Sequence, residues 1–195
     1  MNQPKTILLA SGNKHKIVEL RAMLDSTGIK LVSTLDYPDA GEVDEDQPDL
    51  EGNALKKARY WHQKTGLPAL ADDTGLEVTA LQGEPGVYSA RYAGPGSTDK
   101  ENVEKLLREL SGKNDRTAQF RTVAALAADG EKLFEGICRG TILHEPRGSG
   151  GFGYDSVFRP AGYKESFAEL SAEEKNSISH RGKALANVVQ YLKAE

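Results

Sequence analysis

Residues 117–143 read TAQFRTVAALAADGEKLFEGICRGTIL, two extended runs that flank the dipeptide Asp129-Gly130. Asp-Gly is a strong signal for a tight hairpin turn when β-type segments lie on both sides of it. We therefore expect a long hairpin formed by residues 117–128 and 132–143. A hairpin of this length predicts that one large sheet organises the chain.

Before and after this hairpin in the sequence, short apolar runs alternate with segments whose apolar residues have helical spacing. The apolar runs predict further strands at residues 7–10, 29–32, 69–71 and 76–80. Apolar residues at three-and-four spacing predict helices over residues 17–24, 54–61, 103–110 and 184–192. Residues 83–96 are rich in glycine and proline and should form a loop. The sequence thus predicts an α/β fold: two lobes around a mixed, elongated central sheet with flanking helices and a cleft between the lobes.

The length of 195 residues suits a single domain, residues 1–195, built from these two lobes. The chain is 38% hydrophobic and 28% charged, which is typical of a folded globular protein. Its net charge of −4 argues against a general nucleic-acid binder held by phosphate contacts. A small polyphosphate remains possible, because a few basic residues and a metal ion can supply local positive charge.

Targeting signals are not apparent in the sequence. No apolar run approaches the roughly 20 residues of a membrane span, and residues 1–6 do not resemble the start of a signal peptide. Cys138 is the single cysteine, so no internal disulfide can form. We therefore expect a cytoplasmic protein with no membrane or nucleic-acid partner.

Residues 11–16, SGNKHK, lie between an expected strand and an expected helix. The first turn of a helix has unpaired N–H groups and a positive dipole end, so it attracts phosphate. Gly12 would let the backbone approach the anion, and Lys16 could add an ammonium. An ordinary turn in which Ser11 or Asn13 caps the helix is the alternative, and the residues leave both open.

Asp72-Asp73-Thr74-Gly75 follows a short buried strand that we expect to end there. Neighbouring side chains on extended backbone point to opposite sides, so the two aspartates should do different jobs. One could bind Mg²⁺ or activate water while the other holds the turn, since magnesium needs few carboxylates besides water and phosphate oxygens. A metal-free Asx-turn is the alternative. The acidic loop at residues 44–46 could supply a second carboxylate or simply be solvated.

Residues 150–155, GGFGYD, combine glycines with aromatic rings. The ring of Phe152 could stack on a base with little backbone obstruction, and Asp155 could accept a hydrogen bond from a base N–H. A turn whose aromatic rings complete the core explains the pattern equally well.

A second helix start lies at residues 179–181, Ser-His-Arg. Arg181 could make a forked contact to phosphate or a base carbonyl, and Lys175 lies a few residues earlier. A solvated helix start is the alternative. Lys56 and Lys57 should be surface charges unless the face of Lys57 points into the cleft. The histidines show no metal-ligand spacing, so we expect no zinc site.

Six motifs, in this order, closely resemble the inosine/xanthosine triphosphate pyrophosphatase family from about residue 7 to residue 192. They are residues 11–16 (SGNKHK), 53–59 (NALKKAR), 71–76 (ADDTGL), 85–92 (PGVYSARY), 150–155 (GGFGYD) and 174–181 (EKNSISHR). The resemblance implies a two-lobed α/β fold, a homodimer and hydrolysis of ITP, dITP or XTP to the monophosphate and pyrophosphate. It also implies that a magnesium-bound triphosphate lies in the cleft.

The resemblance also implies roles for individual residues. The phosphate-binding residues would be Ser11, Gly12, Asn13, Lys14, His15 and Lys16, with Lys57 reaching the polyphosphate. Asp73 would bind Mg²⁺ and act as general base, with Asp72 beside it and Thr74 contacting the substrate. The base and sugar would be held by Phe152, Gly153, Tyr154, Asp155, Lys175, His180 and Arg181.

This chain departs from the family pattern at two places. Gly52 stands where the family usually has a glutamate before the asparagine, and Ser156 replaces a usual proline. The acidic metal ligand of the preceding loop corresponds to Glu45 or Asp44, and we prefer Glu45. The carboxylate pair favours an enzyme over a nucleotide-binding regulator, which gains little from negative charge beside a polyphosphate without metal. A pyrophosphatase for modified pyrimidine nucleotides is the alternative enzyme.

Overall fold

The computed structural model describes residues 5–41 and 43–194. Its strands are β1 (Thr6–Leu9), β2 (Lys30–Ser33), β3 (Ala69–Val78), β4 (Pro85–Gly86), β5 (Thr117–Ala127), β6 (Glu131–Ile142) and β7 (Phe158–Pro160). Its α-helices are α1 (Lys14–Leu24), α2 (Leu50–Thr65), α3 (Asp99–Glu109), α4 (Ala172–Ile178) and α5 (His180–Ala194). Short 3₁₀ helices occur at η1 (Asp25–Thr27), η2 (Thr34–Asp36), η3 (Pro38–Ala40), η4 (Thr79–Leu81) and η5 (Ser89–Arg91).

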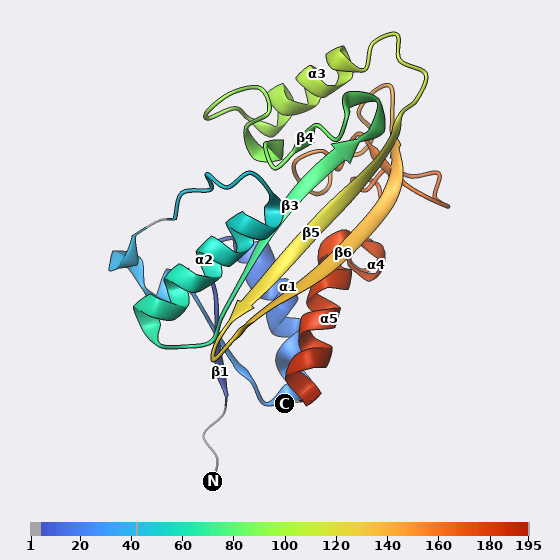
Figure 1. The fold of residues 1–195 in the computed structure, drawn as a ribbon. Coiled ribbons are helices and arrows are strands. Elements are labelled where there is room, and N and C mark those ends of the chain that lie inside the picture. Colours follow the sequence, from blue (N-terminus) through green and yellow to red (C-terminus); the bar gives the residue numbers. More distant parts are fainter. Residues whose placement is uncertain (1–4, 42, 195) are drawn as a thin grey trace. The chain divides into compact units, whose positions relative to one another are not determined.

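The strands form one mixed sheet in the order β2-β1-β3-β5-β6-β7, and β4 pairs with β3 off this path. β1 is parallel to both β2 and β3, whereas β3 and β4, and β6 and β7, are antiparallel. β5 and β6 are neighbours joined at Ala128–Gly130, where the N–H of Ala128 donates to the carbonyl of Gly130 at 2.9 Å. Figure 1 shows β3, β5 and β6 as the longest arrows. The expected hairpin and mixed α/β sheet with flanking helices are therefore confirmed.

Residues 5–41, 43–73, 123–135 and 184–194 form one compact unit, here called the first unit. In β1, Ile7 and Leu9 belong to a core shared with α1 and α5. Leu8, which lies between them, packs with Trp61 of α2 instead. Side chains alternate along a strand, so β1 is covered by apolar residues on both faces. This explains why residues 7–10 form an uninterrupted apolar run.

Residues 74–122 and 136–183 form the other compact unit, here called the second unit. Its core is built around aromatic rings, with the Phe120 and Phe158 centroids 4.7 Å apart and those of Phe158 and Phe167 5.0 Å apart. Leu106 of α3 and Tyr154 belong to the same core. Packing of Tyr154 therefore anchors the glycine-rich loop that precedes it.

Two sequence-based expectations need correction. β3 does not end at Asp72 but runs without interruption from Ala69 to Val78. A strand can continue through two aspartates because both carboxylates meet positive charge, as described below. Residues 83–96 are not entirely loop either, since they contain β4 and η5.

Helix ends follow the local signals in the sequence. Ser171 caps α4 by accepting a hydrogen bond from the N–H of Glu174, and the Glu174 side chain completes the capping box. Gly66 ends α2 with a left-handed backbone, φ 70°. Within the described residues, no helix is long and apolar enough to cross a membrane.

Gly75 provides a test of how closely β3 and β4 approach. A Cβ added to Gly75 would lie 2.6 Å from the carbonyl oxygen of Gly86 in β4, whereas one added to Gly130 in the hairpin turn would meet no atom within 4 Å. We expect Gly75→Ala to lower the free energy of unfolding by about 1–3 kcal/mol, because backbone must move. Gly130→Ala should stay within about 0.5 kcal/mol of the parent protein. Urea unfolding measures both, and equal effects would contradict the close approach.

Candidate functional site

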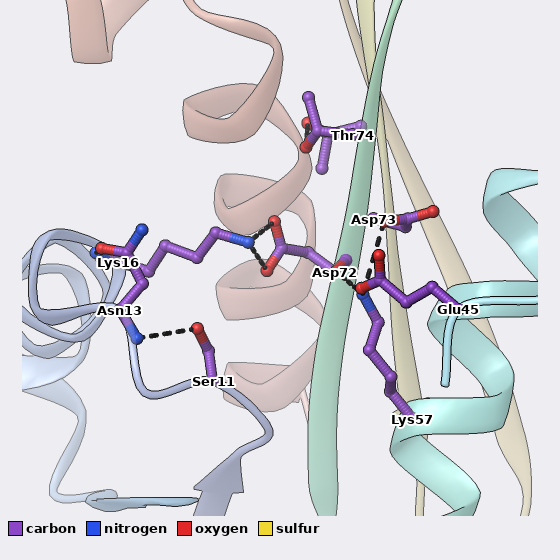
Figure 2. Close-up of polar contacts among 9 residues, drawn as sticks. Ser11, Asn13, Lys16, Glu45, Lys57, Asp72, Asp73 and Thr74 are labelled. Carbon is purple, nitrogen blue, oxygen red and sulfur yellow. Dashed lines mark hydrogen bonds and ion pairs between the residues drawn. The ribbon is translucent and has the colours of Figure 1, made fainter. Parts of the chain in front are cut away.

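β3 carries the two aspartates of the expected magnesium motif. Asp72 and Asp73 are only 5% and 9% exposed. Leu70 belongs to the core with α1 and α5, so alternation places Asp72 on that face. Ala69 packs against Trp61 of α2, so Asp73 shares the α2 face. The two carboxylates therefore point to opposite sides of β3, as Figure 2 shows and as the sequence predicted.

Asp72 forms an ion pair with Lys16 of α1. The Nζ atom of Lys16 lies 2.8 Å from each carboxylate oxygen of Asp72. At the start of α1, Asn13 Oδ1 accepts a hydrogen bond from the Lys16 N–H at 3.4 Å, and Ser11 Oγ accepts one from the Asn13 N–H at 3.2 Å. The helix cap that the sequence allowed is thus present, and Lys16 faces the carboxylate of Asp72. Phosphate binding at this junction stays a prediction.

The other residues of the SGNKHK motif differ in what the structure shows of them. Gly12 and Lys14 are exposed at the junction between β1 and α1. His15 belongs to α1, but its side chain lies outside the described part of the structure. The residues of this motif with described contacts at the junction are therefore Ser11, Asn13 and Lys16.

Lys57 of α2 is the central cation on the opposite face of β3. Its Nζ atom donates to Glu45 Oε1 at 2.5 Å, to the backbone carbonyl of Asp72 at 2.8 Å and to Asp73 Oδ1 at 3.4 Å. Lys57 is therefore not the surface charge that its sequence context also allowed. By contrast, the neighbouring Lys56 pairs with Asp46, and the Asp46 side chain is mostly exposed.

Asn53 is a site residue to which the sequence analysis gave no role. Its Nδ2 atom donates to Asp73 Oδ2 at 3.1 Å, and its Oδ1 atom accepts from the N–H of Gln47 in the acidic loop at 3.0 Å. It lies one helical turn before Lys57, on the same face of α2. A polar residue four positions before a functional lysine is the signal that could have identified it.

Burial and charge oppose each other in this cluster. Burial disfavours the ammonium of Lys57, but the carboxylates of Asp73 and Glu45 outweigh it, so the pKa of Lys57 is raised. Burial also raises the pKa of Asp73. Lys57 and the hydrogen bond from Asn53 counteract this effect, while the negative charge of Glu45 reinforces it. One ammonium is therefore shared by two carboxylates.

Two carboxylates that meet at one lysine suit a divalent cation. Asp73 and Glu45 supply hard oxygen donors, which are the ligands that Mg²⁺ prefers. Asp44 is exposed, whereas Glu45 contacts Lys57, so the geometry favours Glu45 as the second carboxylate. Over residues 5–41 and 43–194, no group of three or more His, Cys, Asp or Glu side chains could hold a metal ion. Magnesium would therefore take its remaining ligands from water and phosphate.

The expected base-binding residues lie in the second unit, around Phe152. Phe152 is 45% exposed, with Lys175 Nζ 4.9 Å and Arg181 Cζ 5.6 Å from the centroid of its ring. Asp155 is buried, and its Oδ2 atom accepts from Lys175 Nζ at 2.6 Å and from the Phe152 N–H at 2.8 Å. A half-exposed aromatic ring thus lies beside two cations.

Tyr154 and Thr74 have partners inside the second unit. Tyr154 is buried, its hydroxyl donates to the carbonyl of Ser89 at 2.8 Å, and burial raises its pKa. Its ring therefore completes the core, which is the alternative that the sequence left open for this loop. The hydroxyl of Thr74 lies 2.7 Å from that of Thr122 in β5.

The start of α5 places His180 and Arg181 in a buried setting. The ring of His180 stacks on Phe120 with centroids 4.5 Å apart and an interplanar angle of 15°. Ser179 Oγ accepts from the N–H of Gly182 at 3.0 Å and so caps the helix. Both His180 and Arg181 are less than a tenth exposed, so they are not the solvated helix start that the sequence also allowed.

Comparisons with known proteins give a consistent result. The sequence model of the Ham1 family matches residues 7–191. A dITP/XTP pyrophosphatase of Desulfotalea psychrophila is 50% identical over 184 residues, covering 93% of this chain and 82% of the relative. A dITP/XTP pyrophosphatase of Geobacter sulfurreducens is 49% identical over 190 residues, covering 95% of this chain and 96% of the relative. The structure of a HAM1 protein from Coxiella burnetii matches with a TM-score of 0.93 at 39% identity, covering 97% of this chain and 99% of that one.

The adjacent lysines of α2 allow a matched test of the charge cluster. Lys57→Met leaves Asp73 and Glu45 without their shared ammonium, so we expect the free energy of unfolding at neutral pH to fall by about 2–3 kcal/mol. Lys56→Met removes only an exposed pair and should change it by less than about 0.5 kcal/mol. Urea unfolding without added metal measures the difference. Similar losses in both variants would show that Lys57 does not balance the charges of Asp73 and Glu45.

Proposed function

Because this chain belongs to the Ham1 family, we propose that it hydrolyses the non-standard purine nucleoside triphosphates ITP, dITP and XTP to the monophosphate and pyrophosphate. Its relatives are dITP/XTP pyrophosphatases, so the chain is a hydrolase that acts on non-canonical purine nucleotides. The observation that carries the proposal is the charge arrangement on β3, where two buried aspartates face lysines from two different helices.

Asp73 is the residue best placed to accept a proton. It is buried, its pKa is raised, and one oxygen bonds to Asn53 while the other lies near Lys57. A carboxylate of raised pKa is a better base for water than an exposed one. In the proposed reaction, water attacks the α-phosphorus, Asp73 takes its proton, and the bond from that phosphorus to the bridging oxygen breaks to release pyrophosphate.

The lysines and the expected metal complete the charge balance. Phosphoryl-type transfer depends on positioning and charge neutralisation more than on covalent chemistry. Lys16, Lys57 and the first turn of α1 would offset the charge on the triphosphate and the leaving pyrophosphate. Asp73 and Glu45 would hold Mg²⁺, with Asp44 the less favoured ligand. When bound, the metal would neutralise phosphate oxygens and polarise the attacked phosphoryl group.

Recognition of the base is assigned to the second unit. Phe152 offers an exposed face for stacking, and Lys175, His180 and Arg181 offer hydrogen-bond donors. A 6-oxo group accepts from such donors, whereas the 6-amino group of ATP would leave them unmatched. We also propose that the protein is a cytoplasmic homodimer. The cleft between two lobes stays a prediction from sequence.

The activity can be tested with ITP, XTP, ATP, GTP and dUTP, each with and without magnesium, by measuring pyrophosphate and orthophosphate. We expect pyrophosphate from ITP and XTP only, and only with magnesium. Orthophosphate would show that a different bond is cleaved. Release from dUTP instead would favour the pyrimidine alternative, and release of neither product would favour a nucleotide-binding protein.

Asp73→Asn tests both the role of Asp73 as general base and the effect of its charge on stability. The variant should lose most pyrophosphate release, because an amide cannot accept the proton. A raised pKa means that ionised Asp73 opposes folding above the ordinary aspartate pKa. At pH 7 without metal, the neutral amide should therefore unfold at the same temperature as the parent protein or a higher one. Calorimetry at pH 7 and pH 3 checks this, since the difference should vanish at the lower pH. A near-normal rate would place the base elsewhere.

A further inference from the structure

Asp99 makes a long-range contact that its position in α3 does not require. α3 is already capped by Thr98 and Glu101, which form a complete capping box. The carboxylate of Asp99 instead accepts a hydrogen bond from the N–H of Gly153, 54 residues further along the chain, at 2.6 Å. The first residue of α3 is thus bonded to the loop that carries Phe152.

The backbone around Phe152 is held by two carboxylates from different segments. Asp155 accepts from the Phe152 N–H at 2.8 Å, and Asp99 accepts from the next N–H, that of Gly153. These two N–H groups belong to the peptide planes on either side of the Phe152 Cα atom. Gly153 has a φ of 60°, a backbone conformation that glycine adopts without strain. Fixing both planes fixes the direction in which the Phe152 side chain leaves the backbone.

That direction decides what the ring can contact. Phe152 is nearly half exposed, and the cations of Lys175 and Arg181 lie 4.9 Å and 5.6 Å from its centroid. Asp155 also binds Lys175, so it orders the ring and one of the cations together. If the Gly153 peptide rotated, the ring would turn relative to both cations.

We propose that Asp99 is a positioning residue that holds the Gly153 peptide so that Phe152 presents its ring to the purine base. This inference rests on the proposed function, because only a base makes the ring direction matter for binding. Asp99 itself does not touch the substrate. It acts through one hydrogen bond to the backbone of the loop.

A purely structural role for Asp99 makes a different prediction. An acidic residue in the first turn of a helix stabilises that helix through its dipole, whatever the loop does. Asp99→Ala would then lower stability but leave KM unchanged. Positioning of Phe152 instead contributes to binding in the ground state and the transition state alike, so its loss should raise KM with little change in kcat.

The experiment compares three variants of the full chain in ITP hydrolysis with magnesium. Asp99→Ala should raise KM about three- to tenfold, the loss expected for one hydrogen bond, with kcat within about twofold. Asp99→Asn keeps an acceptor oxygen of similar shape and should restore KM to within about twofold. Asp115→Ala is the matched control. Asp115 is also exposed and also accepts from a backbone N–H, that of Thr117 at 2.9 Å, so KM should not change.

Hydrogen–deuterium exchange of the segment 148–155 gives a readout that does not need activity. In Asp99→Ala, the amide hydrogens of this segment should exchange several-fold faster than in the parent protein. In Asp99→Asn and Asp115→Ala, they should exchange at the parent rate. An unchanged KM in Asp99→Ala would overturn the proposal, whether or not the exchange of this segment changes. A fall in kcat alone, or an equal KM shift in Asp115→Ala, would also overturn it.

Failure of the proposed function can be distinguished from failure of the positioning role of Asp99. If the parent protein releases no pyrophosphate from ITP, the substrate assignment fails, and the role of Asp99 in base binding fails with it. The exchange comparison then still shows whether Asp99 holds the loop. Normal hydrolysis by the parent with no effect of Asp99→Ala contradicts only the positioning role.

Discussion

A buried carboxylate needs a compensating charge or hydrogen bonds, and β3 presents two of them in succession. Asp72 and Asp73 cannot share one face because side chains alternate along a strand. Each therefore needs a partner from a different helix, and α1 provides Lys16 while α2 provides Lys57. The same alternation sorts the apolar residues of β1 and β3 between these helices. Core packing and charge pairing in the first unit thus follow a single pattern, which places a polar site inside a sheet without unpaired buried charge.

The carboxylate charges on the two faces of β3 are not balanced equally by lysines. On the α1 face, Lys16 meets both oxygens of Asp72, whereas on the α2 face Lys57 is shared between Asp73 and Glu45. Burial raises the pKa of Asp73, and the shared ammonium counteracts this only in part, so ionised Asp73 is unfavourable for folding at neutral pH. Such a local loss of stability is common where a site must bind a cation or accept a proton. On the proposed function, this asymmetry favours Asp73 over Asp72 as the general base.

Local signals predicted much of this fold, and long-range contacts account for what they missed. The Asp-Gly turn and the opposite directions of Asp72 and Asp73 depend only on neighbouring residues, and the structure confirms them. The continuation of β3 through both aspartates depends on Lys16 and Lys57, whose pairing with the strand is not visible in the sequence. The contacts of Asn53 with Asp73 and of Asp99 with Gly153 likewise join distant segments. Roles of that kind become visible only when the fold has brought the partners together.

On the proposed function, donor chemistry explains only part of the base selectivity. Lysine and arginine side chains offer donors and no acceptor, so they favour a 6-oxo group over a 6-amino group. Guanine also carries a 6-oxo group, to which the same donors could bond. Rejection of GTP must therefore depend on position 2 of the base, where guanine has an amino group, hypoxanthine has hydrogen and xanthine has an oxo group. Because the oxo group of xanthine is about as large as the amino group of guanine, size alone cannot separate XTP from GTP. Selection at this position must instead leave the amino donor of guanine without an acceptor, which costs binding free energy. Such selection requires that the base cannot shift toward another acceptor, and the carboxylates that hold the backbone on both sides of Phe152 limit that shift.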